Sequence, residues 1–345
     1  TATAAAAATP GLVVPQRPLP SNHHRRKALL VGINYSSSHA PLKGCVNDLW
    51  NLQCLLRHTL QYADDQLRLL IDTVDGRPQK PDRIPTKANI QAGLRWLVGG
   101  AQPGDSLLFV FCGYGAQHPR TPSSDQYEGY LVPVDYAADL PADFFDRVNR
   151  PSSDNSTVES RAKAAAGGQG YRLLPMLEVA DHIAQLPAMC RMSVMMDCCY
   201  ALIPGVGPGA SHPATFSKVP RGQVDYSKLR DFISRPRFLE LPELPVQHTP
   251  AHIPTNPSPK CWLHGFSGCK IEEWAAEFPI EGTVQGAFSW AFLKALARGH
   301  FHCGLYQFQR VLTEMLTDLR AHFRGVEQTP VVQLSQAANM QDVVL

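Results

Sequence analysis

Short apolar runs alternate along the chain with segments in which apolar residues recur every three or four positions. The apolar runs predict strands buried on both faces of a sheet, and the recurring pattern predicts amphipathic helices. The predicted strands are 27–33, 67–71, 106–112, 129–134, 191–196 and 262–266. The predicted helices are 44–58, 86–98 with Thr86 as N-cap, 176–186, 285–298 and 304–323. This alternation predicts an α/β fold with a mostly parallel central sheet between helices.

Three stretches depart from this pattern. Residues 1–26 are rich in Ala, Thr and Pro and end in a basic cluster, so we expect a disordered arm. Residues 137–170 are polar, and residues 201–260 contain 11 of the 29 prolines, so both are predicted to be long irregular loops. No internal repeat is present, and the rest of the chain favours one domain over 27–345.

The composition excludes several classes of protein. The chain has 345 residues, 44% of them apolar, and a formal net charge of +2, so no basic surface for nucleic acid is indicated. No apolar run approaches the roughly 20 residues that a transmembrane helix needs. Nine cysteines without repeated spacing indicate a reducing, cytoplasmic setting. We expect a monomer, and membrane attachment through residues upstream of this sequence stays open.

Two predicted strands end in unusual sequences. Strand 106–112 leads into Gly113-Tyr114-Gly115-Ala116-Gln117, and strand 191–196 leads into Asp197-Cys198-Cys199-Tyr200-Ala201. In parallel sheets, functional residues collect at the carboxyl ends of the strands.

These junctions resemble the catalytic junctions of the metacaspases, caspase-like cysteine peptidases in which one strand ends in S-G-H-G-x-Q and another in D-x-C-H-S-G. The resemblance extends over about residues 27–345 and implies a caspase-like fold. Further matching segments are 28–35, 42–48, 131–135, 266–270, 285–288 and 328–330.

The resemblance places Cys199 at the nucleophile position, Tyr114 at the position of the general-base histidine, and the Gly115 backbone at an oxyanion hole. A phenol with a pKa near 10 is protonated at neutral pH and cannot accept a proton as imidazole does. Tyr200 and Ala201 also replace the family's His and Ser. We therefore expect catalysis to be impaired.

The acidic specificity pocket is retained in the sequence. The resemblance implies that Asp48 and Asp197 bind an Arg or Lys side chain of the substrate, with Cys112 beside them in place of a serine. Two carboxylates suit a planar guanidinium, which they can hold bidentately. The alternative readings are a helix-surface carboxylate for Asp48 and a turn cap for Asp197.

No cofactor is predicted. Calcium-dependent metacaspases carry a D-D-E run where this chain has Leu173-Leu174-Pro175, and Glu128 is the remaining candidate ligand. A cation that takes 6–8 oxygen ligands is not held by one carboxylate.

Other candidate chemistry has simpler explanations. His118 is a conceivable substitute base, but a loop histidine is more often solvated. Cys198 and Cys199 are able to form a vicinal disulfide, although a buried Cys198 thiol is favoured. Zinc is disfavoured, since the spacing fits no standard site; the candidate ligands are Cys261, His264, Cys269 and His252.

The sequence thus predicts a pseudopeptidase that binds Arg- or Lys-containing segments of other proteins. Regulation through association with an active homologue is a related hypothesis. The alternative is an active cysteine endopeptidase that cleaves after Arg or Lys with Cys199 as its nucleophile.

Overall fold

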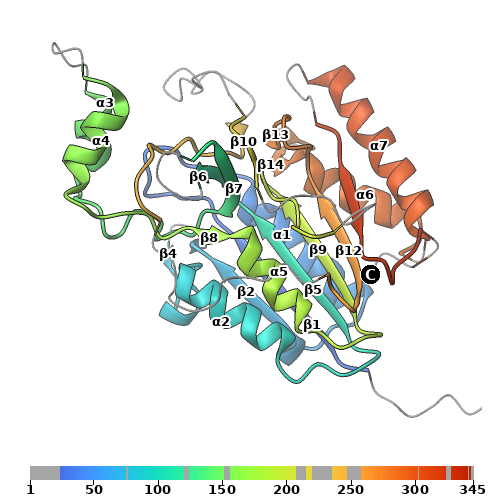
Figure 1. Cartoon of the computed structure of the whole chain (residues 1–345). Helices are drawn as coiled ribbons and strands as arrows, with labels where there is room; N and C mark the ends of the chain where they lie inside the picture. The colour runs from blue at the N-terminus through green and yellow to red at the C-terminus, as the bar shows by residue number, and fades with distance from the viewer. Residues whose placement is uncertain are drawn as a thin grey trace, which may run out of the picture.

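A six-stranded sheet forms the centre of the computed structural model (Figure 1). The structure describes residues 24–74, 77–119, 124–150, 156–206, 215–219, 235–246, 258–301, 303–323, 328–340 and 342. The strands of this sheet, in spatial order, are β15 (Val331–Leu334), β12 (Trp262–Ser267), β9 (Arg191–Asp197), β5 (Ser106–Cys112), β1 (Arg26–Gly32) and β2 (Leu67–Ile71). All neighbours pair in parallel except β15, which is antiparallel to β12. The predicted α/β fold with a mostly parallel sheet is confirmed.

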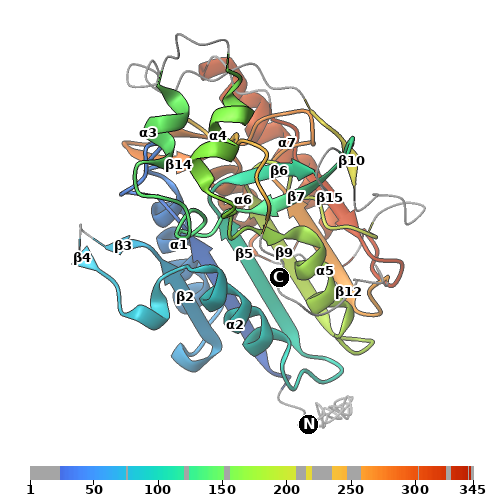
Figure 2. The same ribbon diagram turned by 60° about the vertical axis from the view of Figure 1, so that its left-hand side comes forward.

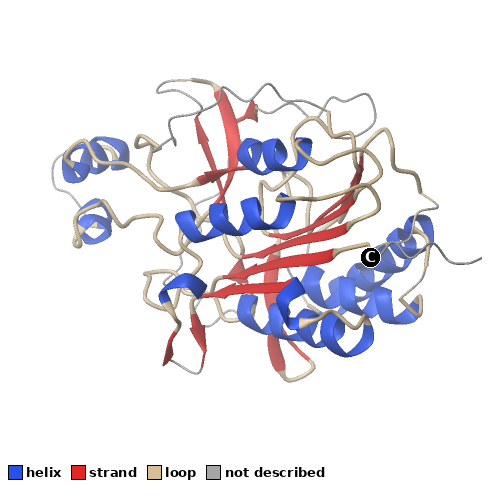
Figure 3. Ribbon diagram, turned by 90° about the horizontal axis from the view of Figure 1, so that it is seen from below, coloured by secondary structure: helices blue, strands red, loops and turns tan. Residues whose placement is uncertain are grey.

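Helices cover both faces of this sheet (Figures 2 and 3). One face carries α2 (Lys87–Val98) and α5 (Met176–Ala184), and the other carries α1 (Cys45–Cys54), α6 (Ala287–Arg298) and α7 (Leu305–His322). Thr86 caps α2 as expected, because its hydroxyl accepts a hydrogen bond of 3.2 Å from the Asn89 amide. A π-helical turn at Leu55–Thr59 extends α1, and 3-10 turns lie at Asp64–Gln66 and Pro81–Arg83.

Three smaller sheets lie outside the main one. The first contains β6 (Gly115–Pro119), β7 (Gln126–Leu131), β8 (Leu174–Pro175) and β10 (Phe216–Ser217). The second contains β11 (Arg235–Pro236), β13 (Ala276–Ile280) and β14 (Thr283–Gly286), and the third contains β3 (Thr73–Val74) and β4 (Arg77–Pro78). The strand predicted at 129–134 is therefore shifted to β7, and it pairs with β6 instead of joining the main sheet. An apolar run predicts a strand, but it does not identify the partner strand.

The two predicted loops contain regular structure. Segment 137–170 contains α3 (Phe144–Asn149) and α4 (Val158–Ala166), so the prediction of an irregular loop was wrong there. The Thr157 hydroxyl caps α4 through a 3.1 Å hydrogen bond from the Ser160 amide. The helix buries alanines, which give little hydrophobic signal in the sequence.

The predicted N-terminal arm is shorter than expected. Arg26, assigned to the arm, begins β1, and its guanidinium donates to the Leu60 carbonyl at 2.6 Å. Residues 1–23 lie outside the described part.

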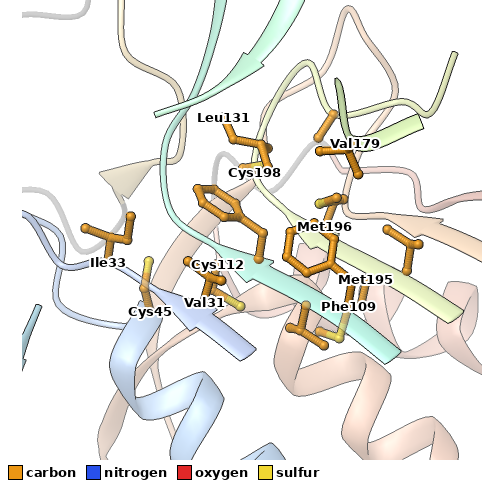
Figure 4. Packing of buried hydrophobic residues seen from close by; sticks show 14 of the residues in the cluster. Val31, Ile33, Cys45, Phe109, Cys112, Leu131, Val179, Met195, Met196 and Cys198 are labelled. Carbon is orange, nitrogen blue, oxygen red and sulfur yellow. The ribbon is translucent and has the colours of Figure 1, made fainter. Parts of the chain in front are cut away.

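Part of the hydrophobic core lies around the carboxyl ends of β1, β5 and β9 (Figure 4). Val31, Phe109 and Val194 on these strands are fully buried, because the strands are covered on both faces. Cys45 of α1 and Cys112 of β5 pack into the same cluster. No described helix combines the length and apolar character required to cross a membrane.

Candidate active site

Two strand ends bring the predicted catalytic junctions together. β5 and β9 are parallel neighbours, and Cys112 is paired with Asp197 in the register. The chain therefore leaves both strands at the same edge of the sheet. A Cβ on Gly115 would lie 1.7 Å from the carbonyl oxygen of Cys199, so only glycine allows the two junctions to approach this closely.

Tyr114 is buried and its polar groups have structural partners. The phenol hydroxyl donates a 2.8 Å hydrogen bond to the carbonyl of Ala40, and the backbone amide donates to the Tyr35 hydroxyl at 2.9 Å. The rings of Tyr35 and Tyr114 are 4.7 Å apart. Because the Tyr114 proton is directed at a carbonyl oxygen, the hydroxyl acts as a donor.

Cys199 is fully buried, and its thiol lies against the backbone of Ala275. The Ala275 amide donates to the sulfur at 3.2 Å, and the Ala275 carbonyl lies 3.9 Å from it. Cys199 packs in an apolar cluster with Tyr200, Phe238, Cys269 and Ala275. Tyr200 has a positive φ of 59° and stacks on Phe216.

His118, the candidate substitute base, is buried in β6 instead of being solvated in a loop. The expectation was wrong because β6 and β7 form a hairpin that encloses the ring. The imidazole packs edge-on against Tyr130 and Tyr171, with centroid separations of 6.3 and 6.2 Å, and its Nδ1 lies 3.3 Å from the Pro119 carbonyl.

The structure places Asp48 and Asp197 on either side of one guanidinium. Arg237, fully buried, places Nη2 2.6 Å from Asp48 Oδ2 and Nη1 2.9 Å from Asp197 Oδ2. Glu277 adds a third buried carboxylate, 3.7 Å from Nη2. We call Asp48, Asp197 and Glu277 the carboxylate cluster. The simpler readings of Asp48 and Asp197, as a surface carboxylate and a turn cap, do not hold because both are buried around Arg237.

Hydrogen bonds fix the orientation of each carboxylate in this cluster. Gly286 donates its amide to both oxygens of Asp48, at 3.0 and 3.2 Å. Ser289 donates its amide and hydroxyl to Asp197 Oδ2, at 2.9 and 2.6 Å. The amides of Lys43 and Gly44 donate to Glu277, each at 2.8 Å. The cluster is thus preorganised by backbone amides from two segments, 43–44 and 286–289, together with the Ser289 hydroxyl.

Burial shifts the pKa values of two members of the carboxylate cluster, Asp48 and Glu277. It raises the pKa of Asp48 to about 7; Arg237 opposes this rise, and Asp197 adds to it. Burial also raises the pKa of Glu277, again opposed by Arg237. For Arg237 itself, burial disfavours the charged form, but the nearby carboxylates outweigh this effect and hold its pKa above the ordinary value.

The backbone of residues 235–239, which we call the Arg237 segment, lies extended between β13 and β6. β11 pairs antiparallel with β13, and the Arg237 amide donates to the Ala275 carbonyl at 2.7 Å. On the other side, the Arg237 carbonyl accepts from the amides of Gly115 at 3.1 Å and Cys199 at 3.2 Å. Leu239 donates to the Gly115 carbonyl at 2.9 Å. The two amides that converge on one carbonyl oxygen include that of Gly115, the predicted oxyanion-hole residue.

The remaining predicted site residues lie nearby. Cys112 is buried, and its sulfur lies 3.6 Å from the hydroxyl of Ser289. The same hydroxyl donates to Asp197, so Ser289 contacts both residues. Glu128 is also buried and accepts a 3.1 Å hydrogen bond from the Tyr130 hydroxyl. In the described part of the chain, no three or more His, Cys, Asp or Glu side chains are arranged so that they could hold a metal ion.

The other cysteine and histidine candidates have separate surroundings. No disulfide joins the cysteines of the described residues, and Cys198 is buried in the main core. His264 faces Asp342, with 3.2 Å between Nε2 and Oδ2, while Cys269 packs beside Cys199. His252, the fourth zinc candidate, lies outside the described residues.

Sequence reasoning missed Arg237, Glu277 and Ser289. Arg237 belongs to the proline-rich stretch, in the sequence Arg235-Pro236-Arg237-Phe238-Leu239, where a basic residue beside an apolar pair was the available signal. Ser289 follows the matched segment 285–288 directly.

Comparisons with known proteins agree with this geometry. A family model described as metacaspase, peptidase C14 domain, matches residues 26–142. Metacaspase-1A of Aspergillus terreus is 28% identical over 283 residues, which cover 79% of this chain and 63% of that protein. Metacaspase-1 of Cryptococcus neoformans is 27% identical over 346 residues, which cover 93% of this chain and 65% of that protein. The chain thus spans less than two thirds of the length of these relatives.

Two further comparisons extend the match. Metacaspase-1 of Mycosarcoma maydis is 44% identical over 115 residues, covering 32% of this chain and 27% of that protein. A crystal structure of protein GSU0716 from Geobacter sulfurreducens shares the fold, with a TM-score of 0.51, 14% identity, and coverage of 90% of this chain and 93% of that one. These comparisons show that the chain is similar to metacaspases over most of its length, and that residues 26–142 match the metacaspase peptidase C14 domain.

Proposed function

We propose that this metacaspase homologue is a catalytically impaired peptidase that acts by binding Arg-containing segments. The observation that carries the proposal is the hydrogen bond from the Tyr114 hydroxyl to the Ala40 carbonyl, at the position where a general base is required. A group that donates to a carbonyl oxygen is not available to remove a proton from a thiol.

The energetic consequence is large. Because Tyr114 stands at the position of the general-base histidine, it supplies neither an imidazole to deprotonate Cys199 nor an imidazolium to protonate the leaving amine. General acid–base catalysis contributes roughly 10²–10⁴-fold, so hydrolysis is expected to be slower by at least that factor.

The carboxylate cluster supports the choice of arginine over lysine as the preferred side chain. Asp48 and Asp197 contact separate nitrogens of the Arg237 guanidinium, at 2.6 and 2.9 Å. A guanidinium presents a planar fork of donors, whereas an ammonium is a single point charge. Lysine would therefore satisfy the two carboxylates less well.

The test is hydrolysis of a fluorogenic peptide with Arg before the reporter group, by the purified chain, with and without calcium. We expect turnover no faster than that of the matched Cys199→Ala variant under both conditions. Robust hydrolysis that disappears in Cys199→Ala would instead establish the alternative, an active endopeptidase. A pH–rate profile would then identify the group that replaces the histidine.

Regulation through an active homologue makes a separate prediction. If the protein acts on such a partner, the two form a stable complex in size-exclusion chromatography, and Cys199→Ala forms it equally well because no intact nucleophile is required. The monomeric state of the isolated chain would be read in the same experiment.

A further inference from the structure

We propose that Arg237 is a built-in occupant of the acidic pocket, which an Arg-containing segment has to displace before it binds, so that removal of this side chain opens a guanidinium-binding site. This inference rests on the proposed function, since it concerns the same pocket. Arg237 fills the pocket, and a guanidinium compound is the ligand that would take its place.

The backbone contacts show that the Arg237 segment is bound as an extended peptide. The carbonyl oxygen of Arg237 accepts hydrogen bonds from the amides of Gly115 and Cys199, which belong to the junctions at β5 and β9. Its amide is held by Ala275 on the opposite side. These bonds involve only backbone groups of the segment, so they position residue 237 whatever its side chain.

The side-chain contacts show that the pocket requires a cation. Asp48, Asp197 and Glu277 are each buried, and Arg237 is the cation that contacts all three. Removing one partner of a buried ion pair leaves an uncompensated charge, which is strongly destabilising. A soluble guanidinium that enters the vacated space would restore the pairing.

The pocket is not saturated by Arg237. Among the described residues, Arg237 Nε and Asp197 Oδ1 are buried without a hydrogen-bond partner. Asp197 Oδ1 therefore remains as an acceptor for a ligand whose planar donors are free to shift. This favours a small guanidinium compound over an amine of similar size.

The experiment compares the wild type with Arg237→Ala, using agmatine as the guanidinium probe and butylamine as the amine probe. Arg172→Ala is the matched control, because Arg172 also lies between two aspartates: its Nε is 2.7 Å from Asp139 and its Nη1 is 3.4 Å from Asp135, but it is partly exposed. Melting temperature and calorimetric binding are measured for each.

We expect Arg237→Ala to melt at a lower temperature than the wild type, and agmatine to raise its melting temperature saturably by a few degrees. Butylamine should give a smaller rise. The wild type and Arg172→Ala should show neither a saturable shift nor measurable binding. A folded Arg237→Ala without an agmatine response, or a wild type that binds agmatine equally well, would overturn the inference.

If Arg237→Ala does not fold, two other measurements test whether Arg237 occupies the pocket. Arg237→Lys retains a cation and should fold but melt below the wild type; an unchanged melting temperature would count against the pocket as a guanidinium site. Limited trypsin digestion of the native wild type should leave the Arg237–Phe238 bond intact and cut it only in urea. Cleavage of the native chain there would show that the segment is not seated.

The two proposals fail in different ways. Hydrolysis of an Arg peptide by the wild type would refute catalytic impairment. The agmatine response of Arg237→Ala would still test the built-in occupant independently. Absence of that response, with no hydrolysis, would refute only the built-in occupant.

Discussion

The backbone amide of Cys199 donates a 3.2 Å hydrogen bond to the carbonyl oxygen of Arg237. The candidate nucleophile is thus connected to a residue 38 positions later in the sequence, which is also the residue that fills the acidic pocket. Because Gly115 donates to the same oxygen, the predicted oxyanion hole is occupied by the chain itself. One residue, Arg237, therefore contacts both the candidate nucleophile and the carboxylates of the acidic pocket.

The raised pKa of Asp48 predicts how stability depends on pH. In the unfolded chain an aspartate titrates near 3.9, whereas burial raises the pKa of Asp48 in the native protein to about 7. Between these values the native protein holds a proton that the unfolded chain has released, so raising the pH lowers the free energy of unfolding. We expect Asp48→Asn to reduce this loss between pH 5 and pH 7.5 by more than about 1 kcal/mol.

Urea unfolding at the two pH values measures this difference. Asp64→Asn is the control, because Asp64 is an exposed carboxylate paired with Arg57 at the surface. An Asp48→Asn variant with the pH dependence of the wild type would show that Asp48 does not titrate in this range.

Gly286 is predicted to be essential to the packing of the carboxylate cluster. Its φ of −67° suits any residue, so substitution causes no backbone strain. A Cβ at this position, however, would lie 2.1 Å from Asp197 Oδ2 and 2.5 Å from Arg237 Nη1. We expect Gly286→Ala to lower the free energy of unfolding by about 1–3 kcal/mol.

Thermal and urea unfolding test this expectation against Thr283→Ala, an exposed position on the same strand β14. Equal stability of Gly286→Ala and the wild type would mean that the guanidinium and carboxylates are able to move apart without cost.

Tyr114→His tests whether only the base is missing. The Arg237 carbonyl already accepts two amide hydrogen bonds, so we expect the variant to cleave its own chain slowly between Arg237 and Phe238. The Cys199 thiolate would attack the Arg237 carbonyl carbon, the C–N bond to Phe238 would break, and the new amine would take a proton from the imidazolium. Water would then hydrolyse the thioester.

Intact-mass spectrometry would detect a fragment that begins at Phe238. Tyr114→Phe and the double variant Tyr114→His/Cys199→Ala should both remain intact. An uncut Tyr114→His chain would contradict this prediction and would move the cause to Tyr200 and Ala201, which also depart from the family pattern.

The main sheet was predictable because its strands carry local signals. β2 lies where the apolar run placed it, and Thr86 caps α2 as its sequence context indicates. The edge strand β15 was missed because it has four residues, three of them partly exposed, and its one buried residue is the polar Gln333. The helix α4 was missed because alanines that pack against a neighbour resemble a polar linker in sequence.

The filled pocket was not predictable for a different reason. The sequence indicated two carboxylates, but the ion pair between Arg237 and Asp48 joins residues 189 positions apart. No local rule identifies which of the chain's basic residues enters a buried site. Only the tertiary structure shows that the cation comes from a proline-rich stretch that the sequence marks as irregular.

Labelling gives the sharpest test that Cys199 is not activated in the resting protein and that Arg237 keeps an external arginine side chain out of the pocket until it is displaced. The purified wild type is incubated at neutral pH with a thiol-reactive probe that carries arginine, and modification of Cys199 is followed by mass spectrometry, with Cys199→Ala as control. We predict no saturable labelling of Cys199 while the protein is folded. Rapid labelling that an arginine peptide competes away, and that Cys199→Ala abolishes, would contradict the account.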